Sequence, residues 1–130
     1  MSNFQKVKNY IIDLDYSILF EDEEDGVMVI ESEEDGIKNL VIGVEDPLLF
    51  MEQSLVDIAD TSGDAYLKLL QKNRDIVHGA FVVDESGTRV IFRDTLQLEN
   101  LDLNEIEASF NSLALLLSEY SDDLISMQKK

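Results

Sequence analysis

The chain has 130 residues, 45% of them hydrophobic, which predicts a single domain over residues 1–130 with its own core. Its 28 acidic residues outnumber 10 basic ones, and the net charge of −18 disfavours nucleic acid and anionic membranes as partners because both repel a polyanion. The absence of cysteine excludes disulfides and thiolate sites. The first ten residues lack the apolar run of a signal peptide, so we expect a cytoplasmic protein.

Residues 2–14 have the pattern of a short helix. Ser2 is a suitable N-cap, and Gln5 stands where a capping box places its second member. Apolar residues then recur at helical spacing and form one stripe, made of Phe4, Val7, Ile11 and Leu14.

The next segment has the pattern of β-strands. Tyr16, Ile18 and Phe20 alternate with their neighbours, and β-branched runs at 27–30 and 37–44 predict two further strands. Acidic segments ending in Asp-Gly separate these runs. Gly26 and Gly36 can adopt the positive φ that hairpin turns require.

Residues 48–58 fit two structures. Asp46-Pro47 is a good helix start, and apolar residues follow at helical spacing, namely Leu48, Met51, Leu55 and Ile58. The same residues fit a fourth strand that follows a turn. Local propensity leans slightly towards the helix.

Residues 64–75 predict a second helix. Tyr66, Leu67, Leu70 and Val77 lie near helical spacing, and Gly79 is a candidate C-cap. His78, the single histidine, is expected to interact with the C-terminus of this helix rather than to bind a metal.

Residues 80–98 predict a hairpin. A loop of Asp84-Glu85-Ser86-Gly87 would place Val83 opposite Thr88 and Phe81 opposite Val90. One face of the hairpin would then carry Phe81, Val83, Val90 and Phe92.

The second face of this hairpin is half apolar, which predicts that it is a partner or dimer surface. It consists of Ala80, Val82, Arg89, Ile91 and Arg93. The two arginines either bind an acidic group or, as we expect, pair with the protein's own acidic side chains on neighbouring strands.

The last segment predicts one long helix of about 25 residues from Asp102 onwards. Asp102 is the N-cap, Glu105 completes a capping box, and Leu101 can pack against Ile106. The wide apolar stripe favours packing across a sheet over a coiled coil.

Two acidic phrases, at 21–26 and 31–36, resemble calcium loops in composition. An EF-hand loop requires a glutamate at its twelfth position, where these phrases have Ser32 and Ile42. We therefore interpret both as solvated turns and predict no metal. Exposed carboxylates also lack the burial that raises the pKa of a general acid, so no catalytic residue and no cofactor is predicted.

Residues 69–102, LLQKNRDIVHGAFVVDESGTRVIFRDTLQLENLD, resemble the YbjN-like branch of the type III secretion chaperone-like (Tir chaperone-like) family. In this stretch a helix ending in Asn-Arg leads through His-Gly-Ala-Phe into a hairpin, and RDTL precedes the final helix. The earlier IKNLVIGVEDP agrees with the same family.

The resemblance implies an α+β fold, with an antiparallel sheet of five to six strands flanked by helices in the order α-β-β-β-(β)-α-β-β-α. It favours a strand at 48–58 and implies a homodimer without catalytic residues or cofactor. The expected function is a non-enzymatic protein-binding module, chaperone-like or an adaptor, for a bacterial protein or peptide client. The alternative is an acidic regulatory or stress-signalling protein that binds a basic partner and is unrelated to secretion.

Overall fold

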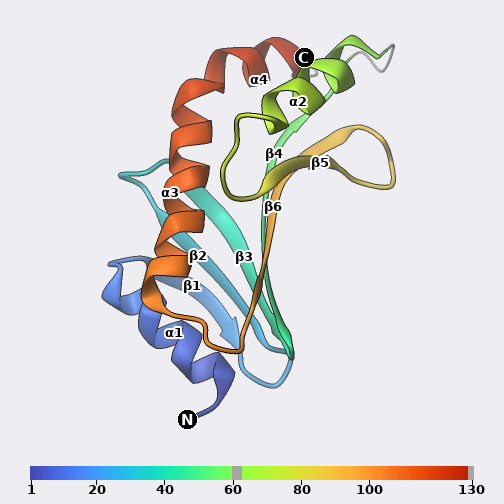
Figure 1. Ribbon diagram of the computed structural model, residues 1–130. Helices are drawn as coiled ribbons and strands as arrows, with labels where there is room; N and C mark the ends of the chain where they lie inside the picture. The colour runs from blue at the N-terminus through green and yellow to red at the C-terminus, as the bar shows by residue number, and fades with distance from the viewer. Residues whose placement is uncertain (60–62, 129–130) are drawn as a thin grey trace.

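The computed structural model describes residues 1–59 and 63–128, which form one six-stranded antiparallel sheet and four helices (Figure 1). The strand order is β1-β2-β3-β4-β6-β5. This arrangement confirms the predicted α+β class. In chain order the elements are α1 (Asn3–Asp13), β1 (Ser17–Asp22), β2 (Val27–Ser32), β3 (Ile37–Glu45), β4 (Leu48–Asp57), α2 (Asp64–Asn73), β5 (Ala80–Val83), β6 (Arg89–Gln97), α3 (Leu103–Glu119) and α4 (Ser121–Met127).

Residues 48–57 form strand β4 and not the helix that local propensity favours, and Ile58 forms an isolated bridge with Gln128. Glu45 pairs with Leu48 across the two-residue turn, and β4 pairs with β3 on one side and β6 on the other. Leu49, Met51 and Gln53 are buried in strict alternation. Pairing on both sides outweighs a slight local preference for helix.

Helix α1 follows the prediction. The Ser2 hydroxyl accepts a hydrogen bond from the Gln5 amide at 3.1 Å, and Phe4, Val7 and Ile11 are buried. The Gln5 side chain donates to Glu23 and not back to Ser2, so the capping box is only half formed.

Strand β1 departs from the predicted alternation at Phe20. The register with β2 shifts between Ile18 and Phe20, so Leu19 is an extra residue in the strand. Such a bulge moves the residues after it to the opposite face. Ile18 packs against the core, whereas Phe20 is 53% exposed.

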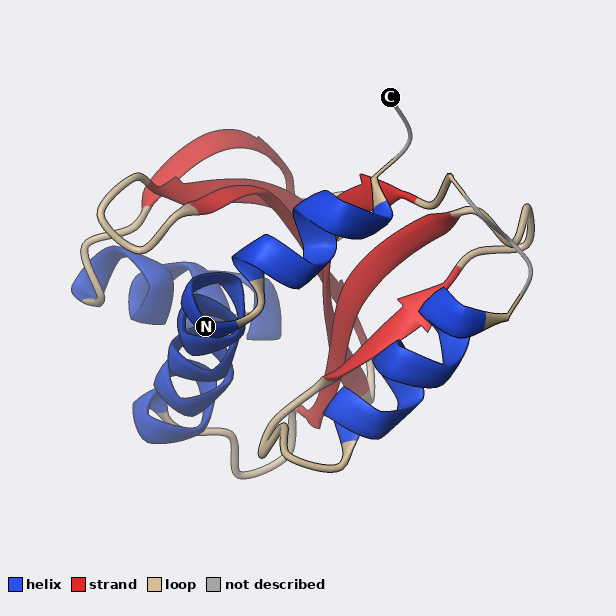
Figure 2. Cartoon of the chain, turned by 90° about the horizontal axis from the view of Figure 1, so that it is seen from above, coloured by secondary structure: helices blue, strands red, loops and turns tan. Residues whose placement is uncertain are grey.

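Helix α2 ends at Asn73, and the predicted C-cap at Gly79 is wrong. The helix buries Ala65 and Leu69, whereas the residues expected to face the core are exposed or only half-buried, namely Tyr66, Leu67, Leu70 and Val77. Seen from above, α2 lies beyond the edge of the sheet (Figure 2). There the side-chain amide of Asn73 donates a hydrogen bond to the Phe81 carbonyl at 3.1 Å and accepts one from the Phe81 N–H at 2.7 Å.

The segment between α2 and β5 is attached to α3. The His78 carbonyl accepts a hydrogen bond from the Ser112 hydroxyl at 2.7 Å, and the His78 N–H donates to the same oxygen at 3.3 Å. Helix α3 therefore holds His78, which lies five residues beyond the end of α2. These hydrogen bonds do not make the predicted contact of His78 with the C-terminus of α2.

The hairpin of β5 and β6 forms with a different register. Val83 pairs with Val90 and Phe81 with Phe92, so the predicted partners were two residues off. Asp84 follows the last ladder pair, and its N–H donates to the Arg89 carbonyl at 3.1 Å, while its carboxylate accepts from the Ser86 N–H in the loop. A shift by two residues preserves the faces, so the predicted division of the hairpin into two faces is confirmed.

The predicted long C-terminal helix is two helices that meet at Tyr120. Its start is as expected, since the Asp102 carboxylate accepts from the Glu105 amide at 2.9 Å. After the break, Asp123 pairs with Lys72 of α2 at 2.8 Å, and Leu124 and Met127 are buried. A straight helix would carry these residues past the end of the sheet.

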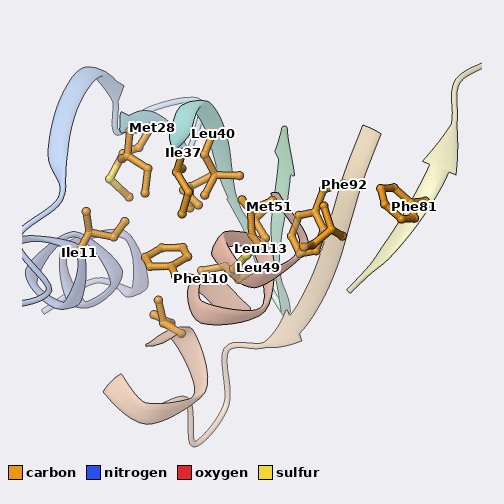
Figure 3. Packing of buried hydrophobic residues seen from close by; sticks show 14 of the residues in the cluster. Ile11, Met28, Ile37, Leu40, Leu49, Met51, Phe81, Phe92, Phe110 and Leu113 are labelled. Carbon is orange, nitrogen blue, oxygen red and sulfur yellow. The ribbon is translucent and has the colours of Figure 1, made fainter. Parts of the chain in front are cut away.

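The core lies between one face of the sheet and helices α1, α3 and α4. Phe110 of α3 packs among side chains from α1 and the strands (Figure 3), and its ring centroid lies 4.5 Å from that of Tyr16. The buried Ser109 hydroxyl donates to Asp94 of β6 at 2.6 Å, which joins α3 to the sheet. Among the described residues, no helix is long and apolar enough to cross a membrane.

Candidate protein-binding surface

The face of the sheet that turns away from α1, α3 and α4 is called the outer face. Residues directly opposite each other on paired strands point to the same side, so the registers define which side chains belong to it. Three of its rows across the strands are Phe20, Val29, Val41, Glu52, Arg93 and Ala80; then Asp22, Val27, Gly43, Phe50 and Thr95; then Ser54, Ile91 and Val82. Beyond the third row, Arg89 of β6 lies opposite Asp57 of β4.

The part of the outer face on β1 to β4 is apolar and open. Phe20 is 53% exposed and Val41 is 42% exposed, and Val29 lies between them in the same row. Val27 and Phe50 are half-buried in the adjacent row. Adjacent apolar side chains on three paired strands, two of them exposed and one half-buried, are typical of a binding surface rather than of scattered surface residues.

A charged cluster adjoins this apolar part. The Arg93 guanidinium forms an ion pair with Glu52 and lies over the Phe50 ring, 4.7 Å from its centroid. Arg89 pairs with Asp57 at 3.3 Å. Both acids stand opposite these arginines on β4, so the predicted cross-strand pairing is confirmed. Cation–π contact and ion pair together hold the Phe50 ring in place.

The five residues predicted as a partner or dimer surface lie together at the β5–β6 end of the outer face. Ala80, Val82 and Ile91 are half-buried, and Arg89 and Arg93 are engaged by carboxylates of the same chain. The structure thus brings all five together, and their contact with a partner stays a prediction.

Sequence reasoning missed the larger, more exposed half of this face. Phe50 could have been found from the alternation in 48–53, where Leu48, Phe50 and Glu52 oppose the buried Leu49 and Met51. Phe20 carried no such signal, because its position depends on the bulge at Leu19.

A second apolar surface surrounds the edge strand β5. Leu67 and Leu70 of α2 are 56% and 68% exposed, and Val83 is 36% exposed. A groove of about 300 Å³ lies between α2 and β5, where Leu70 and Val83 are among the lining residues. This surface adjoins the predicted residue Val82, which also lines the groove.

Acidic turns flank the sheet. Lys8 pairs with Glu21 at 2.9 Å, and the hydroxyl of Tyr16 donates to Asp35 at 3.3 Å. Burial, reinforced by the Asp35 charge, raises the pKa of Tyr16 far above its ordinary value. In the β5–β6 loop, the hydrogen bond from Ser86 lowers the pKa of Asp84.

Across the described ranges, no three His, Cys, Asp or Glu side chains are arranged to hold a metal ion.

Comparison with known structures shows the same fold in proteins of low sequence identity. The YbjN protein of E. coli, a proposed transcription regulator, is 12% identical, covers 92% of both chains and has a TM-score of 0.68. SchA in the HopA1–SchA chaperone–effector complex is 15% identical, covers 94% of this chain and 97% of that chain, and has a TM-score of 0.67.

The Yersinia pestis type III secretion chaperone SycH, solved with a fragment of YscM2, is 14% identical. It covers 98% of this chain and 100% of that chain, with a TM-score of 0.54. No match was found among curated proteins. The family model CesT_Tir_1 matches residues 1–130, and the resemblance inferred from residues 69–102 is therefore confirmed: the chain belongs to the CesT_Tir_1 family.

Proposed function

We propose that the chain is a non-enzymatic, chaperone-like or adaptor-like protein that binds a segment of a partner protein on its outer face. The observation that carries this proposal is the row of adjacent apolar side chains formed by Phe20, Val29 and Val41, which none of the helices in the described part of the chain covers. Relatives of the same fold have been solved with protein partners, SchA with HopA1 and SycH with a fragment of YscM2.

The charge of the chain indicates which partner segments suit this face. Nine carboxylates lie between Glu21 and Asp35, in the strands and turns beside Phe20 and Val29. An apolar segment with flanking lysine or arginine would bury its apolar side chains on the row and place its charges near these turns. Acidic segments would be repelled.

We propose in addition that two copies associate through the β5–β6 end of the outer face. Ala80, Val82 and Ile91 are half-buried apolar residues at this end, and Val82 also lines the groove between α2 and β5 together with the exposed Leu70 and Val83. Light scattering over a range of concentrations tests this association with the wild type and Ile91→Asp. A strict monomer in both, at equal stability, would contradict it.

The alternative is a regulatory protein that recognises a basic partner by charge alone. It is favoured by the net charge of −18, and the E. coli YbjN relative is a proposed transcription regulator. The two functions differ in their response to salt, because contacts between exposed charges are screened whereas apolar burial is not.

The experiment is selection of random 12-residue peptides displayed on phage, followed by affinity measurements with synthetic peptides at low and high salt. The chaperone-like function predicts peptides that contain apolar residues and lose less than about tenfold in affinity at high salt, because apolar burial remains when the contacts of the flanking charges are screened. A loss of more than about 100-fold at high salt would favour the charge-reading function instead.

A further inference from the structure

The sheet divides between β3 and β4. Their ladder runs from the Glu45–Leu48 pair to the Val41–Glu52 pair and stops there. Beyond that point, within residues 1–59 and 63–128, β3 pairs only with β2, and β4 only with β6. The two strands meet at their shared turn and spread apart towards the other end (Figure 1). We call the opening between residues 37–40 and 53–57 the fork.

Two irregularities that face each other open the fork. The register between β2 and β3 shifts between Ile30 and Ser32 of β2, and on the β3 side Asn39 adopts a left-handed φ of 49°. In β4 the register with β6 shifts between Ser54 and Val56, which leaves Leu55 without a partner. A bulge bends its strand, so the pair of bulges turns β3 and β4 away from each other.

The fork leaves backbone groups of β4 without strand partners. The Val44 N–H donates to Gly26 on the β2 side, so by alternation Gly43 and Val41 present their backbone groups to β4. The backbone N–H and C=O groups of their partners Phe50 and Glu52 point towards β3, and by the same alternation those of Ser54 point into the fork. Between described residues, the hydrogen bond that crosses the fork is from the Lys38 N–H to the Gln53 side chain, at 3.2 Å.

A cleft of about 650 Å³ occupies the fork. Leu117 of α3 and Leu124 of α4 line it from the helix side, and Leu55 and Val41 line it from the strands. The cleft therefore combines a strand edge that lacks a partner with an apolar floor. An extended peptide satisfies both, because its backbone pairs with strands while alternate side chains point to one face.

Charges of both signs lie at the cleft and near it. Lys38 and Glu52 line the cleft, and the Glu52 carboxylate is paired with Arg93. Glu33, Glu34 and Asp35 are exposed in the turn that precedes β3. The open strand edge and the apolar floor, rather than charge, therefore define the segment that suits the cleft.

We infer that the fork binds an extended segment of a partner protein, with apolar side chains at alternate positions, as a strand inserted between β3 and β4. The inference rests on the proposed function and adds a position and a backbone geometry to it. An inserted strand differs from a strand added to β1 or β5, because it uses the N–H and C=O groups along both of its edges.

This difference gives the test. The probe is a fluorescein-labelled peptide of about eight residues that alternates valine and lysine, with two versions N-methylated at every odd or every even amide. Fluorescence anisotropy with the wild-type protein should show binding of the unmodified probe and a loss of at least about tenfold for both methylated versions. A loss for only one version, or for neither, would overturn the inserted strand, and so would an unmodified probe that does not bind.

Substitution of the floor locates the binding. Leu117→Lys places a charge at the cleft and should weaken the probe at least about tenfold, whereas Leu115→Lys, on the same helix but 58% exposed and outside the cleft, should not. If Phe20→Asp weakens selected peptides and Leu117→Lys does not, the fork is excluded while the proposed function stands. The methylated probes use the wild type, so they decide the matter even if Leu117→Lys unfolds.

Discussion

The two acidic turns look equivalent in sequence, but we predict that alanine is tolerated very differently at their glycines. Gly26 and Gly36 both end an Asp-Gly turn, with φ of 71° and 73°. A side chain at a left-handed φ costs about 1 kcal/mol at either position. A Cβ at Gly36 meets no atom within 4 Å, whereas at Gly26 it would lie 2.4 Å from the Val44 carbonyl oxygen.

The atom that a Cβ at Gly26 would meet belongs to the backbone. The Gly26 carbonyl also accepts a hydrogen bond from the Val44 N–H at 2.7 Å. Relief therefore requires the turn and the end of β3 to separate. Forced overpacking costs about 1–3 kcal/mol, so Gly26→Ala should lose about 2–4 kcal/mol of unfolding free energy in total, against about 1 kcal/mol for Gly36→Ala.

Urea unfolding followed by circular dichroism measures both variants against the wild type. Gly36→Ala is the matched control, since it has the same φ and the same preceding residue. Equal losses for the two variants would show that the steric contact at Val44 contributes nothing to the cost of Gly26→Ala.

Three further predictions concern the edge of the sheet, alkaline stability and self-association. Asn73→Ala leaves the Phe81 N–H and carbonyl without their partner and should cost about 1–3 kcal/mol in urea unfolding; an unchanged midpoint would show that water replaces the amide. Because burial and the Asp35 charge raise the folded-state pKa of Tyr16, the unfolded chain loses this proton first, so stability is present below about pH 10 and declines above it. Tyr16→Phe should flatten this decline between pH 9 and about 11, and equal declines in both proteins would exclude Tyr16 as its cause. Ile91→Asp should lower the light-scattering mass towards that of a monomer, and an unchanged dimer would place the interface elsewhere.

The sequence predicts those elements whose signals are local. The caps at Ser2 and Asp102 and the two faces of the β5–β6 hairpin depend on residues close together in the chain, and the structure has them as expected. The break at Tyr120 was not predictable in this way, because it depends on contacts with residues far away in the chain. Asp123 of α4 pairs with Lys72 of α2, and Gln128 after α4 pairs with Ile58 after β4.

The residues of the candidate surface likewise fall into two groups, those that local alternation predicts and those that it does not. Ala80, Val82 and Ile91 were found because one hairpin alternates cleanly. The exposed position of Phe20 and the fork both arise from β-bulges, where a single extra residue reverses the face or bends the strand. Asn39 is the exception with a visible clue, since asparagine tolerates the left-handed conformation better than most residues.

The most direct test of binding on the outer face is the affinity of one selected peptide for three proteins: the wild type, Phe20→Asp and Ile125→Asp. Both substituted side chains are strongly exposed, at 53% and 65%, but Phe20 lies on the outer face and Ile125 lies on α4. If the peptide binds on the outer face, Phe20→Asp weakens binding at least about tenfold, as expected for loss of a buried aromatic contact, while Ile125→Asp leaves it within about twofold. Equal affinity of all three proteins would contradict binding on the outer face.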